Sequence, residues 1–265
     1  MKKIYDENGK LFAELNYSEN YYLSYSKHSH DSLAFTVFFD GDIEVLFHNI
    51  DELNVDSKQV IVYNPHQVHV TKSKRANVKE YYTLHIDTVW SKQTQNSIFE
   101  NLNEFLYLQN IIEEESIYKR LYEISQSIYF DKDFEIEQLK DLIKEIIEKY
   151  TILNKEQNKE EPELIKKVEE YIEQNIEEQI SLEDISKAVC YDESYITRVF
   201  KKKYGLTPHA FIINKRVQKA KEKLALSKDV NIAQLSNEVG FYDQSHFSKV
   251  FKKVFAITPN KYRKQ

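Results

Sequence analysis

Cysteine is nearly absent from this chain of 265 residues, which contains Cys190 alone. A single cysteine excludes a disulfide framework and a CxxC motif, and it suits a reducing compartment. Glycine is also scarce, with four residues, and no glycine-rich phosphate loop occurs. No Ser-His-Asp nucleophile elbow is present either. We therefore expect a protein that is not an enzyme and that carries no resident cofactor.

Long apolar runs are missing as well. No stretch approaches the ~18 apolar residues that a membrane-spanning helix needs, and residues 1–7 lack the apolar core of a signal peptide. We expect a cytoplasmic protein with no membrane partner.

The chain does contain an internal repeat near its C-terminal end. Residues 194–208 and 245–259 share the pattern Ser-x-apolar-x-cation-Val-Phe-Lys-Lys-x-aromatic-x-apolar-Thr-Pro, at an offset of 51 residues. The similarity continues upstream at an offset of 50, through residues 182–190 and 232–240. One short structural unit therefore occurs twice, and each copy carries a basic helix.

The spacing within each copy predicts two helices joined by a turn. In the first copy, apolar residues at 182, 185 and 189 fall on one helical face, and a second apolar face starts at Ile196. The change of offset falls in the intervening turn, where an extra residue is best tolerated. Gly240 suits a positive φ at a helix end, and Asp192 and Asp243 can cap the helix that follows. Each copy is therefore predicted to be a helix-turn-helix unit.

Charge is distributed unevenly along the chain. The net charge is −6, but residues 181–265 contain 17 Lys and Arg against 8 Asp and Glu, whereas residues 1–180 contain 20 against 35. A basic module with two helix-turn-helix units is typical of nucleic-acid binding. The alternative for a lysine run is a solvated helix face, but duplication of the run at the same helical phase favours binding.

Residues about 163–265 resemble the DNA-binding domain of the AraC/XylS family of bacterial transcription regulators. The second copy carries most of the resemblance, through residues 232–253 and 258–263, while Cys190 occupies a position that is often Gly. The resemblance implies that the second helix of each unit enters the major groove. It also implies that a long helix, here about residues 211–226, holds these recognition helices about one DNA turn, roughly 34 Å, apart.

The resemblance also implies which side chains meet DNA. Arg198 suits a guanine edge and Gln244 an adenine edge. The base-facing candidates are Ser194, Thr197, Arg198, Gln244, Ser245, Ser248 and Lys249. The phosphate-facing candidates are Lys201, Lys202, Lys252 and Lys253. Because the base-facing residues differ between the copies, we expect an asymmetric DNA site with two dissimilar boxes.

Three residues of this module have open alternatives. Ser194 and Ser245 can be helix caps instead of base contacts. Arg216, in the long helix, can be an internal ion-pair partner instead of a DNA contact.

The first part of the chain predicts a second domain of mixed structure. Residues about 1–90 contain short apolar runs separated by turn signals, which predict a small antiparallel β-barrel or sandwich. Residues about 95–153 change to helical spacing, and the polar residues 154–162 form a linker. We therefore predict an α+β fold with two domains, 1–153 and 163–265.

The predicted helices of residues 95–153 carry an apolar stripe between Ile136 and Ile147. Such a stripe either packs onto the barrel of its own chain or forms a seam between two chains. We expect a homodimer through these helices, with intrachain packing as the open alternative.

The barrel resembles the two short motifs of cupins through His28, His30, Gly41, Asn64, Pro65 and His69. Metal-binding cupins also use a Glu, whose position here is Ala34. The resemblance implies a pocket for a small organic effector, with a three-imidazole metal site or plain structural residues as alternatives. The expected pocket residues are His28, His30, Phe35, Val37, Tyr63, His69 and Tyr82, of which the apolar and aromatic ones can also be ordinary core.

Two classes of function follow. The first is a sequence-specific transcription regulator, an activator as most of the family are, which a small organic effector controls. Its partners are double-stranded DNA and, for an activator, RNA polymerase. The second is a metal-dependent cupin, an enzyme or a metal sensor, that uses His28, His30 and His69 and carries an appended DNA-binding module. The missing carboxylate at Ala34 argues against the second class.

Overall fold

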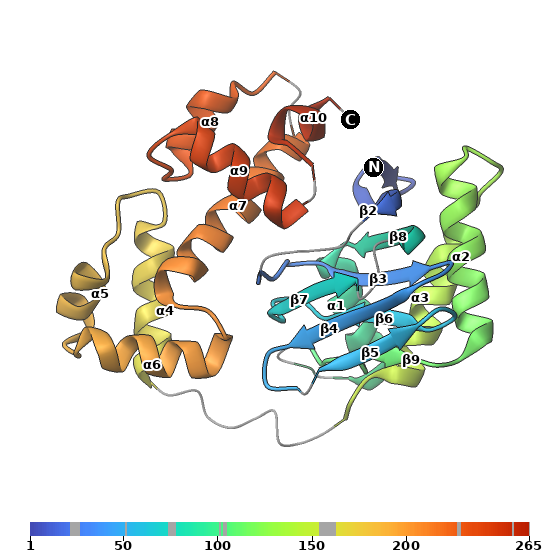
Figure 1. Cartoon of the computed structure of the whole chain (residues 1–265), viewed down its shortest axis with the longest axis horizontal. Coiled ribbons are helices and arrows are strands. Elements are labelled where there is room, and N and C mark those ends of the chain that lie inside the picture. The colour runs from blue at the N-terminus through green and yellow to red at the C-terminus, as the bar shows by residue number, and fades with distance from the viewer. Residues whose placement is uncertain are drawn as a thin grey trace. The chain divides into compact units, whose positions relative to one another are not determined.

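The computed structural model describes residues 1–21, 27–50, 52–73, 78–100, 102, 105–153, 163–226, 229–255 and 257–264. They belong to two compact units, the first Met1–Ser24 with His30–Lys155, the second Glu156–Gln265 with the short segment Tyr25–Ser29. The strands lie in the first unit, and the described elements of residues 163–264 are all helices (Figure 1). The predicted α+β fold is confirmed. The predicted linker at 154–162 lies outside the described residues.

The first unit contains two antiparallel sheets. The larger has the strand order β1-β2-β8-β3-β6-β9 and the smaller has β5-β4-β7. Their bounds are β1 (Lys2–Tyr5), β2 (Leu11–Tyr21), β3 (Leu33–Phe38), β4 (Asp42–Phe47), β5 (Leu53–Asp56), β6 (Val60–Tyr63), β7 (His69–Ser73), β8 (Val78–Ile86) and β9 (Ile111–Ile112).

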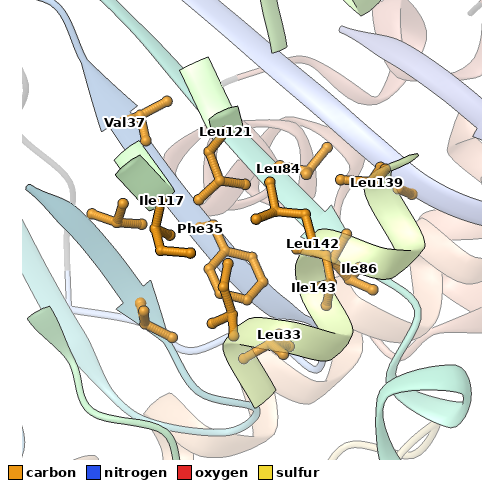
Figure 2. Close-up of a cluster of buried hydrophobic side chains, with 14 of the residues drawn as sticks. Leu33, Phe35, Val37, Leu84, Ile86, Ile117, Leu121, Leu139, Leu142 and Ile143 are labelled. Carbon is orange, nitrogen blue, oxygen red and sulfur yellow. The ribbon is translucent and has the colours of Figure 1, made fainter. Parts of the chain in front are cut away.

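Side-chain alternation gives the larger sheet two different faces. Leu33, Phe35 and Val37 of β3 belong to a core shared with helices α2 (Glu115–Tyr129) and α3 (Ile136–Tyr150), as Figure 2 shows. The residues between these along the strands of the larger sheet point to its other face. On that face, the Tyr63 hydroxyl of β6 lies 3.0 Å from the Thr71 hydroxyl of β7, in the smaller sheet. The two faces therefore have different chemistry, apolar toward the helices and partly polar between the sheets.

The apolar stripe of α3 packs onto the sheet of its own chain. Ile136 is partly buried against the core, and the other members are fully buried in it: Leu139, Leu142, Ile143, Ile146 and Ile147. Burial of one such side chain contributes about 1.5–3 kcal/mol, so releasing the stripe to a second chain would be costly. The alternative of intrachain packing is the correct one for this stripe.

The boundary between strands and helices differs from the expected one. Helix α1 (Thr88–Phe99) starts before residue 90, and β9 pairs with β6 although it lies within the region expected to be helical. A strand of two residues is too short for a periodic signal, which is why the sequence did not reveal it.

The second unit has the expected helical order. Its elements are α4 (Glu163–Asn175), α5 (Leu182–Val189), α6 (Glu193–Tyr204), α7 (Pro208–Leu226), α8 (Ile232–Glu238), α9 (Gln244–Phe255) and α10 (Pro259–Arg263). Helices α5 and α6 form the first helix-turn-helix unit and α8 and α9 the second. Between them, α7 has 19 residues, or about 28 Å at 1.5 Å per residue.

The turns of the two units share a left-handed residue after the first helix. Gly240 has φ 86°, and Cys190, at the equivalent position, has φ 58° and ψ 41°. An L-residue with a side chain is strained in this region, and glycine is not. The prediction of a positive φ at Gly240 is confirmed.

The Cys190→Gly variant is therefore expected to be more stable, by about 0.5–1 kcal/mol, because the strain at φ 58° is removed. Thermal unfolding of the full chain measures this change. A lower midpoint than that of the wild type would contradict the expectation.

Arg216 joins three parts of the second unit. It is 5% exposed, and its Nε donates to the Ile176 carbonyl at 2.9 Å while Nη2 donates to the Glu178 carbonyl. Its guanidinium also lies against Gly240. Burial lowers the pKa of Arg216 from its usual value. Arg216 is therefore an internal residue, as the alternative proposed, but its hydrogen-bond partners are backbone carbonyls and not the carboxylate of an ion pair.

Candidate nucleic-acid interface

The start of each recognition helix is capped by an aspartate. The Asp192 carboxylate accepts from Ser194 N at 2.8 Å and from Tyr195 N at 3.2 Å, and Asp243 accepts from His246 N at 2.8 Å. Ser194 and Ser245 lie inside their helices, exposed, and do not cap them. The capping alternative is wrong for both serines, so their hydroxyls remain available for other contacts.

The candidate DNA contacts lie on one face of each recognition helix. In α6, residues 194, 197, 198 and 201 follow the three-and-four spacing of a single helical face. The equivalent positions in α9 are 245, 248, 249 and 252. Phe200 and Phe251 are fully buried beneath these faces, and Thr197 and Ser248 are partly exposed. Gln244, Lys202 and Lys253 are exposed beside them.

The cations of these faces differ from other lysines of the same unit. Elsewhere in the unit, lysines pair with carboxylates: Lys167–Glu163, Lys187–Glu183, Lys219–Glu177 and Lys223–Glu238, at 2.6–3.2 Å. Within the described part of the chain, no carboxylate pairs with Arg198, Lys201, Lys249, Lys252 or Lys253. Among the described residues, the positive charge of these five side chains is thus not paired with a carboxylate, which suits a polyanionic partner.

Three exposed tyrosines beside these faces were missed by the sequence reasoning. Tyr191 and Tyr242 occupy equivalent turn positions and are 46% and 88% exposed, and Tyr195 of α6 is 40% exposed. Tyr191 and Tyr242 are 51 residues apart, which is the offset of the repeat, and this recurrence could have identified both from the sequence.

The predicted pocket residues of the first unit fall into two groups. His30, Tyr63 and His69 are buried close together, with ring centroids 5.1 Å apart for His30–His69 and 4.4 Å for Tyr63–His69. Phe35, Val37 and Tyr82 belong instead to the core against the helices, because strand alternation turns them to the opposite face. His28 is buried in the segment that groups with the second unit.

Hydrogen bonds fix the imidazoles between the sheets. His30 Nδ1 lies 2.9 Å from the Ser32 carbonyl, and His69 Nδ1 lies 2.9 Å from the Gln67 carbonyl. A carbonyl can only accept, so Nδ1 carries a proton in both rings. His85, whose Nδ1 is 2.9 Å from the Ser32 hydroxyl, adds a third ring 5.0 Å from His30.

The second cupin-like motif has a structural role. Asn64 is fully buried, and its side chain accepts from Leu108 N at 2.7 Å and donates to the Leu108 carbonyl at 3.0 Å. Among the residues that the structure describes, no group of three or more His, Cys, Asp or Glu side chains could hold a metal ion. The three-imidazole site of His28, His30 and His69 is therefore not assembled.

Of the described helices, none is long and apolar enough to cross a membrane.

Comparisons with known proteins agree with the architecture of the second unit. A family model described as a helix-turn-helix domain matches residues 185–265. The Tn10 TetD protein of Escherichia coli is 34% identical over 101 residues, which are 38% of this chain and 72% of that protein. Three further curated relatives match over a similar stretch, and the chain covers only 33–38% of the length of these three.

Two comparisons extend over most of the chain. The uncharacterized HTH-type transcriptional regulator YdeC of Bacillus subtilis is 24% identical over 252 residues, 89% of this chain and 85% of that protein. The solved structure of ToxT from Vibrio cholerae superposes with a TM-score of 0.58 at 15% identity, over 95% of this chain and 98% of ToxT. The fold is therefore that of ToxT. With its two helix-turn-helix units and these relatives, the chain belongs to the AraC/XylS family of transcription regulators.

Proposed function

We propose that the protein is a sequence-specific transcription regulator whose recognition helices α6 and α9 read two dissimilar boxes of duplex DNA. The observation that carries this proposal is the pair of matched helix faces, where Arg198, Lys201, Lys249 and Lys252 have no carboxylate partner among the described residues. Phosphates would attract these faces, and the exposed polar side chains between the cations would read base edges. The relatives named as transcription regulators support the same function.

A mobility-shift assay with the DNA upstream of the protein's own gene tests this proposal. We expect a shifted complex that weakens steeply with salt, because phosphate contacts release counterions. If no segment of that DNA gives a salt-sensitive shift, the proposal is wrong.

Arg198 is the side chain to which we assign the strongest base contact, with a guanine. Arg198→Ala is expected to relax selectivity at one base pair, costing about 1–3 kcal/mol there, while binding to random DNA changes little. Binding to duplexes that carry each base at each position measures this effect. An equal loss on specific and random DNA would contradict the assignment.

We infer further that a small organic effector binds the first unit. The buried polar rings of His30, Tyr63 and His69 between the sheets support a site for such a molecule. One ToxT structure holds an unsaturated fatty acid, so long-chain organic acids are the first class to test. Titration with these acids, read as a change in affinity for DNA, tests the inference, and no change with any of them contradicts it.

The remaining parts of the proposal concern partners. As an activator, the protein would contact RNA polymerase, and its DNA target implies the cytoplasm as its compartment. A homodimer through the helices of residues 95–153 would have to use their exposed polar faces, such as Arg120 and Glu123 of α2, because the apolar faces are buried.

A further inference from the structure

Two aromatic contacts meet at Tyr195, at the start of α6, and form a stack on the protein surface. The rings of Tyr191 and Tyr195 have centroids 5.8 Å apart and an angle of 19° between their planes. The Arg198 guanidinium carbon lies over the Tyr195 ring as well, 5.2 Å from its centroid. Both rings are substantially exposed, so the stack is not part of the hydrophobic core.

The backbone under this stack is fixed. The Ser186 hydroxyl donates to the Tyr191 carbonyl at 2.6 Å, and Tyr191 N donates to the Ser186 carbonyl at 3.3 Å. Tyr195 N is held by the Asp192 cap. The rings therefore stand on an ordered turn and an ordered first helical turn, and they can orient a neighbouring flexible side chain.

A guanidinium that lies on an aromatic ring keeps its hydrogen-bonding capacity. The cation–π attraction uses the face of the guanidinium, while its five N–H donors point outward in its plane. A bidentate contact with guanine O6 and N7 uses that same plane. Stacking also restricts the rotamers of Arg198 before DNA arrives, which reduces the entropy lost on binding.

The second unit lacks this arrangement. Its equivalents of Tyr191, Tyr195 and Arg198 are Tyr242, His246 and Lys249. The His246 ring lies edge-on to Phe241, with centroids 5.4 Å apart. Within the described part of the chain, no aromatic ring lies under the Lys249 ammonium. Among the described residues, an orienting ring therefore lies below the candidate base-reading cation of the first unit and not below that of the second.

We propose that Tyr195 is a positioning residue that holds Arg198 ready to read a guanine, and that the first unit consequently contributes a more strictly read base than the second. This rests on the proposed DNA-binding function. Tyr195 acts through Arg198 and makes no base contact of its own.

A double-mutant cycle on a defined duplex tests this role. The duplex is selected from a randomised pool by the full-length wild-type chain, and affinity is measured for Tyr195→Ala, Arg198→Ala and the double variant. We expect Tyr195→Ala to weaken specific binding about 3–10-fold and to lower discrimination at the same base pair that Arg198→Ala relaxes. In the Arg198→Ala background, Tyr195→Ala should change affinity less than twofold.

Two matched controls isolate the ring from other effects. Tyr195→Phe keeps the aromatic face and removes only the hydroxyl, so affinity within twofold of the wild type is expected. Binding to random duplex DNA should be unchanged in both Tyr195 variants. Because Tyr195 is exposed, its variants are expected to fold, and unfolding midpoints check this.

Several results would overturn the role of Tyr195. Equal losses from Tyr195→Ala in the wild-type and Arg198→Ala backgrounds would mean that the ring contacts DNA itself. A Tyr195→Phe variant as weak as Tyr195→Ala would assign the effect to the hydroxyl. If the wild-type chain selects no duplex, the proposed function itself is contradicted. If it does select a duplex but the effects of Tyr195→Ala and Arg198→Ala are additive, only the positioning role is contradicted.

Discussion

Gly240→Ala is expected to destabilise the second unit by about 3–5 kcal/mol. A Cβ at Gly240 would lie 2.7 Å from Arg216 Nε, 2.8 Å from Arg216 Cζ and 2.8 Å from the Ile176 carbonyl oxygen. Overpacking of this kind costs about 1–3 kcal/mol, and alanine at φ 86° costs about 1 kcal/mol more. Displacement of the guanidinium would also weaken its bonds to two carbonyls, at about 1–3 kcal/mol for each buried group left unsatisfied.

Two alanine variants serve as controls for the backbone strain. Gly9 has φ 75°, but nothing lies within 4 Å of a Cβ built there, so Gly9→Ala should cost only about 1 kcal/mol. Cys190 already carries a Cβ at the equivalent turn of the first unit, so Cys190→Ala should be close to neutral.

Denaturant unfolding of the full chain gives the free energies, and hydrogen exchange of the α8 and α9 amides locates the loss. If Gly240→Ala costs no more than Gly9→Ala, the close approach of Arg216 does not limit this position.

Removing three cations from the recognition helices is expected to have the largest effect on DNA affinity. Each phosphate contact contributes about 0.9 to the slope of log K against log salt. The triple variant Lys201→Ala, Lys252→Ala, Lys253→Ala should therefore lower that slope by about 2.7 and weaken binding roughly a hundredfold at 0.15 M salt. The loss should be similar on specific and random duplexes, because phosphates carry no sequence information.

Fluorescence anisotropy with a labelled duplex, from 50 to 200 mM salt, measures both quantities. The matched control is Lys219→Ala with Lys223→Ala, whose ammonium groups pair with Glu177 and Glu238 at 2.7 and 3.2 Å. This control removes two positive charges from the same unit and should leave the slope nearly unchanged. An equal fall in both variants would mean that net charge, and not these helix faces, determines binding.

The helix-turn-helix architecture could be predicted from the sequence because its signals are local. The apolar spacing around Ile185 and Ile196, the aspartate before each recognition helix and the glycine at 240 all act within a few residues. The structure agrees with each of them. The hydrogen bonds of Arg216 could not be predicted in this way, because its partners lie about 40 residues away along the chain.

The candidate sites were less predictable because they depend on tertiary placement. Alternation implies that neighbouring strand residues such as Thr36 and Val37 face opposite ways, but it does not tell which face meets helices and which meets a second sheet. Salt bridges are likewise predictable only when both residues are close in the sequence. Lys187–Glu183 is visible as an i,i+4 pair, whereas Lys219–Glu177 joins residues 42 apart. Which lysines remain uncompensated could not be read from the sequence.

The bonds around Arg216 also bear on how the promoters of this regulator can evolve. Gln179, in the segment after α4, donates to the Gly240 carbonyl at 3.1 Å, next to the Arg216 contacts. These hydrogen bonds connect the two helix-turn-helix units at a point other than α7. Neither unit can therefore rotate freely about α7. One base pair inserted between the DNA boxes rotates one box by roughly 35° around the duplex axis. If α6 and α9 read two boxes as proposed, base substitutions within a box would change one contact at a time. A single inserted or deleted base pair between the boxes would instead turn one box out of register with its recognition helix.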